Sequence, residues 1–430
     1  MTLVCPECFG DRGLKRRIEE IRPNFPNEKC TFHPTRKGVP IAEVTAIVGA
    51  IFPSFYSHGE YRPWSNGQEG DPLQYVLQEF CGATDEVAEP LAEQLMEDEI
   101  VYPQDGDFAF YADDQSYVRQ GGAGSYHNDQ LWERFCRSVL HSQRFFNTDA
   151  KALIAQLFEN VDAQRNNQKQ SPIYEIRPGD EQSTFYRARV VAGRDQIKKF
   201  ISDPAGQLGV PPERLRRANR MNPAGIACFY GAFEIDTCIA EIRPTVGGLV
   251  AAGRFELTRP VFVLDMTKFE APIRPMSMFE KAYFEKIEQW AFMQSFMEQI
   301  AKPVLPSDEY LDYIPTQAVA EYLQHHHKIK QERQPSKIEG VIFQSAQLPP
   351  SMNIVLFGGA GQLPEKMQRP PELSALQIEA FEALANFGNQ QTNPGIRYAD
   401  GSLAFHEITS AQFASVQTTF GSKEGAEEPF

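Results

Sequence analysis

Residues 220–243 read RMNPAGIACFYGAFEIDTCIAEIR and combine a turn, a strand and a short helix in one compact unit. The Asn-Pro-x-Gly segment near its start has the composition of a turn, and the apolar, aromatic run 227–233 predicts a buried strand. Asp236 and Thr237 then offer N-cap oxygens for a helix that reaches Glu241. The unit presents one tyrosine and one carboxylate between two arginines, an arrangement that suits an anionic, sugar-like ligand.

Motifs around this stretch resemble the RES domain, a family named for its Arg, Glu and Ser residues. Its members show an arginine in an opening strand, an Arg-x-Asn-x-x-Gly turn, a tyrosine, a glutamate on the next helix and, later, a serine at a strand end. The matching segments are FYRAR at 185–189, Arg220 with Asn222 and Gly225, Tyr230, Glu241, GVIFQSAQ at 340–347 with Ser345, and SMNIVLF at 351–357. The resemblance covers roughly residues 183–360, the size of one domain.

The resemblance implies an α+β fold similar to that of ADP-ribosyltransferases, and characterised members of the family degrade NAD. It also carries over a set of site residues. The expected catalytic residues are Glu241, Tyr230, Arg187 and Ser345, and the expected substrate-binding residues are Arg187, Arg220, Asn222, Tyr230 and Ser345. The sequence has no G-x-G-x-x-G or P-loop motif, so we expect NAD as a substrate and not as a hydride carrier.

The arginines and the glutamate suit this chemistry as residue types. Arg187 lies inside an apolar strand and therefore needs an anionic partner, such as a pyrophosphate held by a bidentate guanidinium contact. Arg220 is a second candidate for the same anion, and for either arginine the alternative is a surface ion pair. Glu241 could stabilise the positive charge that builds on the ribose as nicotinamide leaves. Its alternative is an ion pair with Arg243 on the helix surface.

Tyr230 and Ser345 each allow two interpretations. Tyr230 would orient the ribose or stack on nicotinamide, whereas an aromatic residue in a buried strand is also ordinary core. Ser345 would donate a hydrogen bond to a phosphate or to the nicotinamide amide, and its alternative is a capping or turn serine. No G-x-S-x-G motif frames it, which argues against a nucleophile. Gln317 and Asn353 are further candidates for groups that support the site.

The composition limits the classes of protein to which the chain can belong. A chain of 430 residues is long enough for two or three domains, and its net charge of -15 disfavours a nucleic-acid-coating protein. No apolar run is long enough to cross a membrane, and residues 1–17 lack the apolar core of a signal peptide, so we expect a cytoplasmic protein. Seven cysteines, an odd number, argue against a disulfide framework.

The N-terminal segment, residues 1–38, predicts a zinc site. It holds a C-x2-C pair and a C-x2-H pair, formed by Cys5, Cys8, Cys30 and His33. Two short knuckles separated by a helix at 14–21 would converge on one tetrahedral ion. So small and polar a segment has little core without metal, so the zinc would be structural. The alternative is two unconnected thiol pairs.

Residues 39–165 predict a mostly helical domain, because apolar residues recur at helical intervals. The predicted helices are 41–52, 71–81, 87–99, 128–145 and 149–159. The polar, Gly-rich span 105–124 predicts a loop or a weak hairpin. The segment WERFCRSVLHSQRFF at 132–146 resembles the HEPN-related helical domains that precede RES domains in some long members. Arg134 and His141 have the spacing of HEPN ribonucleases, and their alternative is a packed or solvated polar helix face.

The rest of the chain supplies a linker, further helices and an extension. We expect an interdomain linker at 166–183, a RES domain at 184–362 and a C-terminal extension at 363–430. The RES domain should contain helices at 278–300 and 317–327. The extension should contain a helix at 374–387, a hairpin-like segment and a disordered tail. Adjacent His325, His326 and His327 point in different directions on a helix and predict a solvated helix end without a metal.

The sequence therefore predicts an α+β protein with a zinc-bearing, mostly α-helical N-terminal domain and an ADP-ribosyltransferase-like RES domain. The expected function is an NAD phosphorylase or NAD glycohydrolase that acts as a toxin or defence effector. The alternatives are an ADP-ribosyltransferase that modifies a macromolecule, and a HEPN-type RNA-cleaving or partner-sensing defence protein. The expected ligands are NAD, as substrate, and a structural zinc. The expected partner is an inhibitory antitoxin or an activating protein; a homo-oligomer is left open, and neither nucleic acid nor membrane is expected.

Overall fold

The computed structural model describes residues 1–62, 67–99, 109–120, 126–301, 304, 307–330, 336–364 and 393–411. Contacts divide the chain into two compact units. Unit 1 consists of Met1–Ile173, Met266–Ile300 and Ile329–Pro335, and unit 2 of Tyr174–Asp265, Ala301–Lys328 and Ser336–Phe430. The described residues contain both helices and strands, which confirms the predicted α+β class. None of the described helices is long and apolar enough to span a membrane.

The N-terminal part of unit 1 packs four helices around a cluster of aromatic rings. The helices are α1 (Arg12–Ile21), α2 (Ile41–Gly49), α3 (Leu73–Cys81) and α4 (Asp85–Asp98). α1 begins where the Asp11 side chain accepts the Leu14 N–H at 2.8 Å, which caps the helix. The fully buried Phe52 ring stacks on Tyr56 at 4.8 Å and meets Phe80 edge-on at 5.3 Å. Rings of this size bury much apolar area, so they stabilise this part of the fold.

Short strands complete the N-terminal part. They are β1 (Leu3–Val4), β2 (Val39–Pro40), β3 (Tyr56–His58), β4 (Tyr61–Arg62), β5 (Gly67–Gln68), β6 (Asp71–Pro72) and β7 (Ser116–Arg119). β1 pairs with β2, β4 pairs with β5, and β7 lies between β3 and β6. The span 105–124, predicted as a loop or weak hairpin, therefore contains a strand whose partners come from earlier in the chain. Such a pairing is a long-range contact that local composition does not reveal.

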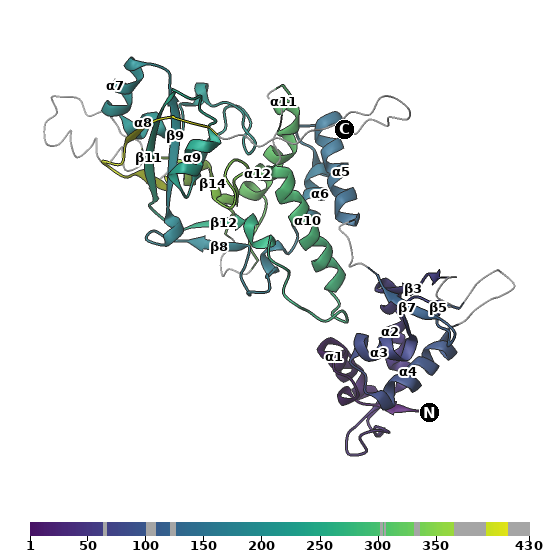
Figure 1. The fold of residues 1–430 in the computed structure, drawn as a ribbon. Helices are drawn as coiled ribbons and strands as arrows, with labels where there is room; N and C mark the ends of the chain where they lie inside the picture. The colour runs from purple at the N-terminus through teal and green to yellow at the C-terminus, as the bar shows by residue number, and fades with distance from the viewer. Residues whose placement is uncertain are drawn as a thin grey trace, which may run out of the picture. The chain divides into compact units, whose positions relative to one another are not determined.

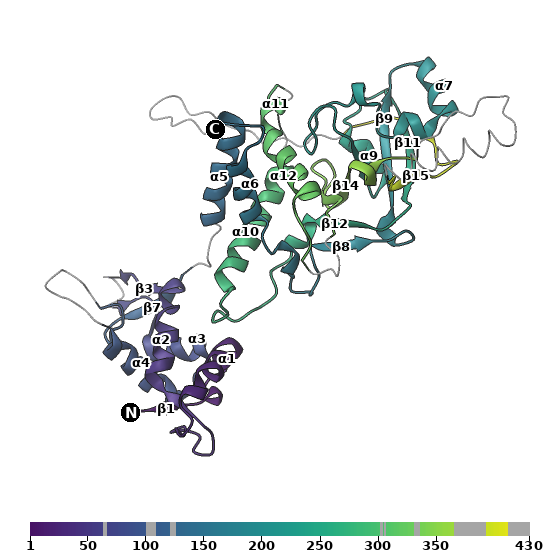
Figure 2. The same cartoon turned by 180° about the vertical axis from the view of Figure 1, so that it is seen from behind.

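Three longer helices complete unit 1. In both views α5 (Tyr126–His141), α6 (Thr148–Leu157) and α10 (Tyr283–Ala301) lie side by side (Figure 1, Figure 2). The Trp132 ring of α5 lies 5.1 Å from Phe296 of α10, and its Nε1–H donates to Gln299 Oε1 at 2.7 Å. The helix predicted at 278–300 is thus confirmed with a later start, and it packs within unit 1. The five helices predicted in 39–165 are also confirmed, with shifted ends.

Unit 2 is built on a nine-stranded sheet in the order β15-β11-β9-β10-β14-β13-β12-β8, with β16 also paired to β11. The strands are β8 (Ile173–Ile176), β9 (Thr184–Val191), β10 (Cys228–Ala232), β11 (Leu249–Leu257), β12 (Val261–Asp265), β13 (Gly340–Gln344), β14 (Met352–Phe357), β15 (Ile396–Tyr398) and β16 (Ala404–Glu407). β12 and β13 are parallel, and the pairs from β15 to β13 are antiparallel. Fully buried Phe229 packs on Phe255 at 4.8 Å and on Phe185 at 5.5 Å, which forms the centre of the core.

Two features of this sheet differ from the sequence expectations. β8 falls inside 166–183, the predicted linker, so the chain enters the sheet before the first RES motif. The hairpin-like segment predicted in the extension is wrong, because β15 and β16 both pair with β11. The predicted helix 374–387 and the predicted tail lie outside the described residues.

The strands that carry the candidate site pair with their neighbours over different lengths. β9 pairs with β11 at eight positions but with β10 only where Tyr186 lies opposite Ala232. Arg187 and Tyr230 therefore lie where β9 and β10 stop pairing. A Cβ added to Gly231 would lie 2.9 Å from the Tyr186 carbonyl oxygen, so the close approach at this junction requires glycine.

Helices lie on and beside the sheet (Figure 1). They are α7 (Arg194–Ser202), α8 (Pro204–Leu208), α9 (Ile235–Glu241), α11 (Glu309–Asp312) and α12 (Ile314–His325). α9 follows β10 directly and packs against β9, β10, β11 and β14. Its N-cap is Glu234, so the predicted caps Asp236 and Thr237 are wrong and lie inside the first turn. α12 begins at Ile314, earlier than the helix predicted at 317–327.

Candidate active site and metal centre

Glu241 ends α9 and is held at one carboxylate oxygen. Ser345 Oγ donates to Glu241 Oε1 at 2.6 Å, and Asn353 Nδ2 donates to the same oxygen at 2.7 Å. Within the described part of the chain, no hydrogen bond reaches Oε2 and no ion pair joins Glu241 to Arg243. Arg243 follows the helix with a φ of 45°, in the left-handed region. The surface ion pair weighed as the alternative for Glu241 is therefore not formed.

Ser345 both shapes a turn and orients this carboxylate. It is 1 % exposed and directly follows β13. Its Oγ accepts the N–H groups of Gln347 at 3.2 Å and Leu348 at 3.1 Å, while its proton is donated to Glu241. Both lone pairs of the hydroxyl are thus engaged. The geometry favours a positioning role for Ser345 over nucleophilic attack.

The Tyr230 hydroxyl holds the turn that carries Arg220 through hydrogen bonds. The Asn219 N–H donates to the Asn222 carbonyl at 2.9 Å and the Asn222 N–H to the Asn219 carbonyl at 3.2 Å, which leaves Arg220 and Met221 at the tip. The Tyr230 hydroxyl donates to Asn222 Oδ1 at 2.8 Å and accepts the Met221 N–H at 3.0 Å. Burial raises the pKa of Tyr230, so the hydroxyl remains a donor at neutral pH.

Asn222 is buried, and its side chain is used inside the turn. Its Nδ2 lies within hydrogen-bond distance of three carbonyls, those of Arg217 at 3.1 Å, Pro223 at 3.0 Å and Ile226 at 3.2 Å. Direct substrate contact by Asn222 stays a prediction. The geometry favours a residue that shapes the turn on which Arg220 is carried.

Arg187 places a positive charge in unit 2 without a carboxylate beside it. Its Nη1 is buried with no hydrogen-bond partner, and no described residue forms an ion pair with it. The guanidinium carbon lies 4.8 Å from the centre of the Phe229 ring. Burial, assisted by the charge of nearby Arg189, lowers the pKa of Arg187 to about 9. A buried cation with an unsatisfied donor is costly, so this position favours an anionic ligand.

Arg220 lies over the Tyr313 ring, with its guanidinium carbon 5.0 Å from the ring centre. Burial lowers the pKa of Arg220, and the charges of nearby Tyr313, Tyr230 and Glu241, together with a hydrogen bond to the Tyr313 side chain, oppose that shift. Tyr230 influences Arg187 in the same way. The structure thus brings the predicted arginines, tyrosine, glutamate and serine into one neighbourhood. Sequence reasoning missed Tyr313, which belongs to no motif and meets Arg220 only through the fold.

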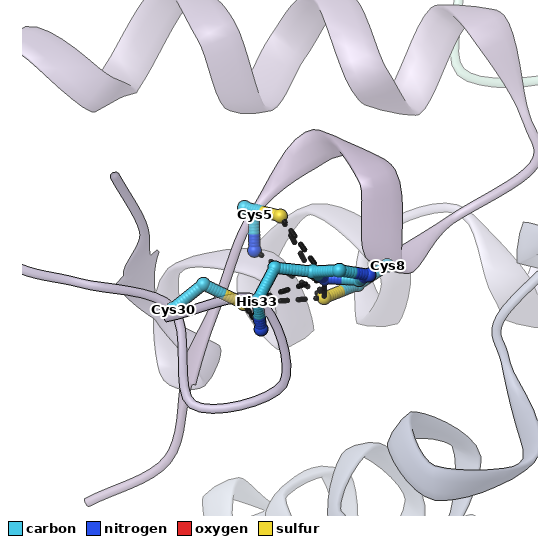
Figure 3. Close-up of side chains that lie close together, drawn as sticks. All are labelled: Cys5, Cys8, Cys30 and His33. Atoms are coloured by element: carbon cyan, nitrogen blue, oxygen red, sulfur yellow. Dashed lines mark hydrogen bonds between the residues drawn. The ribbon is translucent and has the colours of Figure 1, made fainter. Parts of the chain in front are cut away.

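Cys5, Cys8, Cys30 and His33 converge at one point (Figure 3). Their sulfur and nitrogen ligand atoms all lie within 4.8 Å of one another. The Cys5 and Cys8 sulfurs are 4.0 Å apart, the Cys8 and Cys30 sulfurs are 3.5 Å apart, and His33 Nδ1 lies 3.4–3.8 Å from each sulfur. Tetrahedral zinc, with bonds of ~2.3 Å to sulfur and ~2.0 Å to nitrogen, would separate its ligand atoms by about 3.5–3.8 Å. The donor set therefore fits one tetrahedral ion with four protein ligands.

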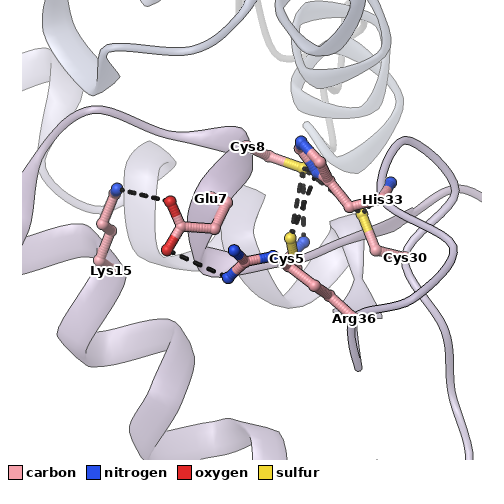
Figure 4. A network of polar contacts seen from close by, with 7 residues as sticks. All are labelled: Cys5, Glu7, Cys8, Lys15, Cys30, His33 and Arg36. Atoms are coloured by element: carbon pink, nitrogen blue, oxygen red, sulfur yellow. Dashed lines mark hydrogen bonds and ion pairs between the residues drawn. The ribbon is translucent and has the colours of Figure 1, made fainter.

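Ion pairs link the two knuckles around this cluster (Figure 4). Glu7, which lies between Cys5 and Cys8, contacts Lys15 of α1 at 3.3 Å and Arg36 at 3.3 Å. Arg36 follows the second knuckle, so a single carboxylate connects both parts of the cluster. Solvent-exposed pairs of this kind contribute little stability. The four ligands themselves remain the main candidates for holding the segment together.

The other histidines that the sequence singled out lie at helix surfaces or helix ends. Arg134 and His141 are both exposed on α5, which fits a solvated helix face, and a ribonuclease role for them stays a prediction. His325 and His326 are exposed, whereas His327 is buried near the Tyr322 ring. The expected solvated helix end is thus wrong for His327, whose N–H donates to the Tyr322 carbonyl at 2.9 Å just beyond the end of α12.

The purified protein is expected to contain one zinc ion per chain by elemental analysis. Cys8→Ser should remove that zinc and lower the melting temperature of unit 1, because metal binding contributes to the folding free energy of such a segment. Cys136→Ser, which changes a cysteine outside the cluster, should retain the zinc. Full zinc content in Cys8→Ser, or none in the unmodified protein, would contradict the assignment.

Arg187→Met is expected to raise the free energy of unfolding of unit 2 by about 1–4 kcal/mol, because an apolar side chain of similar length replaces a desolvated, unpaired cation. Arg189→Met is the matched control and should destabilise, since Arg189 Nη2 donates to the Gly209 carbonyl at 2.7 Å. Chemical denaturation measures both variants. A loss of stability in Arg187→Met would show that the charge is already compensated.

Comparison with known proteins identifies the segment that contains this site. The family model described as the RES domain matches residues 184–378. No curated protein and no solved structure gives a significant match to the chain. The match includes 266–300, which packs in unit 1, so its range does not coincide with either unit. The predicted resemblance of the C-terminal part is confirmed, and the chain carries a RES domain.

Proposed function

We propose that this protein is an NAD-consuming enzyme that cleaves the bond between nicotinamide and ribose. The RES family is associated with NAD-directed activity. The observation that supports the proposal most directly is Glu241, held at Oε1 by two neutral donors and free of described partners at Oε2. A carboxylate fixed in this way can interact with a ribose hydroxyl and with the cationic sugar of the transition state.

The arginines provide the complementary half of the proposed site. NAD carries a diphosphate, and both Arg187 and Arg220 are desolvated cations near Tyr230. A diphosphate would satisfy the buried Nη1 of Arg187, which has no partner of its own. Binding at the diphosphate would position the distant nicotinamide bond relative to Glu241, an effect of orientation.

The proposed reaction breaks the C–N bond between ribose and nicotinamide. Its electron pair moves to the ring nitrogen and neutralises the pyridinium, while positive charge builds on the ribose. An oxygen of the acceptor then forms the new bond to the same carbon. Phosphate would yield ADP-ribose-1″-phosphate, and water would yield ADP-ribose and release a proton. Transfer to a macromolecule is the alternative.

The zinc proposed for the Cys5, Cys8, Cys30 and His33 cluster would take no part in this cleavage. Four protein ligands close a tetrahedral coordination shell and leave no position for substrate. The ion would stabilise the N-terminal segment instead.

Glu241→Gln is expected to lower kcat for NAD loss by about 100-fold or more, because it removes a charge that stabilises the transition state. Purified protein is incubated with NAD, with and without phosphate, and the products are separated by chromatography. Glu234→Gln, at the N-cap of the same helix, is the matched control; Glu234 accepts a hydrogen bond from Ser351 Oγ at 2.8 Å, and this variant should stay within about twofold of the unmodified protein.

The outcomes separate the proposed reactions. Loss of NAD that requires phosphate indicates a phosphorylase, and loss without it indicates a glycohydrolase. Unchanged NAD loss in Glu241→Gln would refute the assigned role of this carboxylate. Label transfer from NAD to a protein or nucleic acid, without free ADP-ribose, would support the transferase alternative.

Ser345→Ala is expected to lower kcat only about tenfold, because Asn353 still holds Glu241 Oε1. The measurement is single-turnover cleavage of NAD. A covalent role for Ser345 would instead require complete loss of turnover in this variant. Ser351→Ala, which removes a hydroxyl bonded to Glu234, serves as the control.

A further inference from the structure

We infer that the corner between α11 and α12 positions Arg220, with Tyr313 as the stacking residue that fixes the direction of its guanidinium. The inference rests on the proposed function in one respect, that Arg220 binds the diphosphate. It adds Tyr313 and Thr316 to the site as positioning residues that act through Arg220, and it gives Gln317, predicted from the sequence to support the site, the same role. None of the three needs to touch the substrate.

The corner holds the Arg220 turn through three contacts. The Tyr313 ring lies under the Arg220 guanidinium at 5.0 Å. Thr316 Oγ1 donates to the Arg220 carbonyl at 2.6 Å, and Gln317 Nε2 donates to the Asn219 carbonyl at 2.8 Å. These contacts come from one turn of the chain and reach two consecutive residues. They fix the backbone of the turn and the side chain that it presents.

The opposite side of the same turn is held by β10. The Tyr230 hydroxyl bonds the Met221 N–H and the Asn222 side chain. Asn219 and Asn222 close the turn through two backbone hydrogen bonds. Arg220 therefore lies between two anchors, one on β10 and one on α12. Its backbone has little freedom, and the Tyr313 ring is the described aromatic face on which its guanidinium stacks.

The electrostatic surroundings strengthen this stacking. Burial lowers the pKa of Arg220, and a desolvated cation interacts more strongly with an aromatic face than a solvated one does. Arg220, Glu309 and Arg243 are the charged groups that act on Tyr313, and its hydroxyl donates to Glu309 Oε1 at 3.2 Å. A guanidinium oriented before binding loses less conformational freedom when the ligand arrives. Tyr313 should therefore affect affinity more than the chemical step.

A double-mutant cycle with ADP-ribose as the ligand tests the inference. Calorimetry gives Kd for the unmodified protein, for Tyr313→Leu, for Arg220→Ala and for the double variant. We expect Tyr313→Leu to weaken binding about fivefold, Arg220→Ala to weaken it about tenfold, and the double variant to match Arg220→Ala. Tyr313→Phe keeps the ring and removes only the hydroxyl contact with Arg220, so it should weaken binding less than Tyr313→Leu does. Additive losses, or a Tyr313→Phe as weak as Tyr313→Leu, would overturn the inference.

Thr316→Val provides a second test if Tyr313→Leu does not fold. It keeps the shape of the side chain, removes the bond to the Arg220 carbonyl and should weaken ADP-ribose binding about threefold. Unchanged affinity in this variant, with an unchanged circular dichroism spectrum, would also overturn the inference. NAD turnover is measured separately. If the double-mutant cycle shows coupling but the protein does not consume NAD, only the proposed function is refuted. If the unmodified protein does not bind ADP-ribose, the role given to Arg220 is refuted.

Discussion

The geometry of the candidate site depends on the register of β14. Asn353 lies opposite Ala232 of β10 and opposite Phe343 of β13. Ala232 immediately precedes the segment that leads into α9 and Glu241, and Ser345 follows Phe343 by two residues. One row of the sheet therefore sets the positions of a carboxylate and of its two donors, although their segments are far apart in sequence. A slip of one residue would turn Asn353 to the other face of the sheet and remove one of these donors. The pairing of β14 and the turn that begins at Ser345 together fix the orientation of Glu241.

The same region carries charges that burial disfavours. Arg187 and Arg220 both have lowered pKa values, while the carboxylate of Glu241 is held by a hydroxyl and an amide. An arginine paired directly with Glu241 would neutralise both charges and leave neither for a ligand. Neutral donors hold the carboxylate in place without cancelling its charge. A site of this kind gives up stability to keep both signs of charge accessible, a common trade-off in binding sites.

The sequence predicted those parts of the fold whose evidence is local. The apolar runs and turn residues that define β9, β10, α9, β13 and β14 lie within short segments, and the two pairs of metal ligands lie within one small segment. What it could not predict depends on contacts between distant segments. The sequence could not decide which residue contacts Glu241, because Arg243 is close to it in sequence whereas Ser345 is not. Tyr313 has no motif, and its role follows only from where α12 meets the Arg220 turn.

The choice of acceptor in the proposed reaction is an electrostatic question. Ser345 has both lone pairs engaged, so the attacking oxygen would have to come from an acceptor and not from this hydroxyl. Phosphate is an anion, and Glu241 would repel it at the carbon that it must reach. Water meets no such barrier. Phosphorolysis would therefore require a cation beyond those that bind the diphosphate.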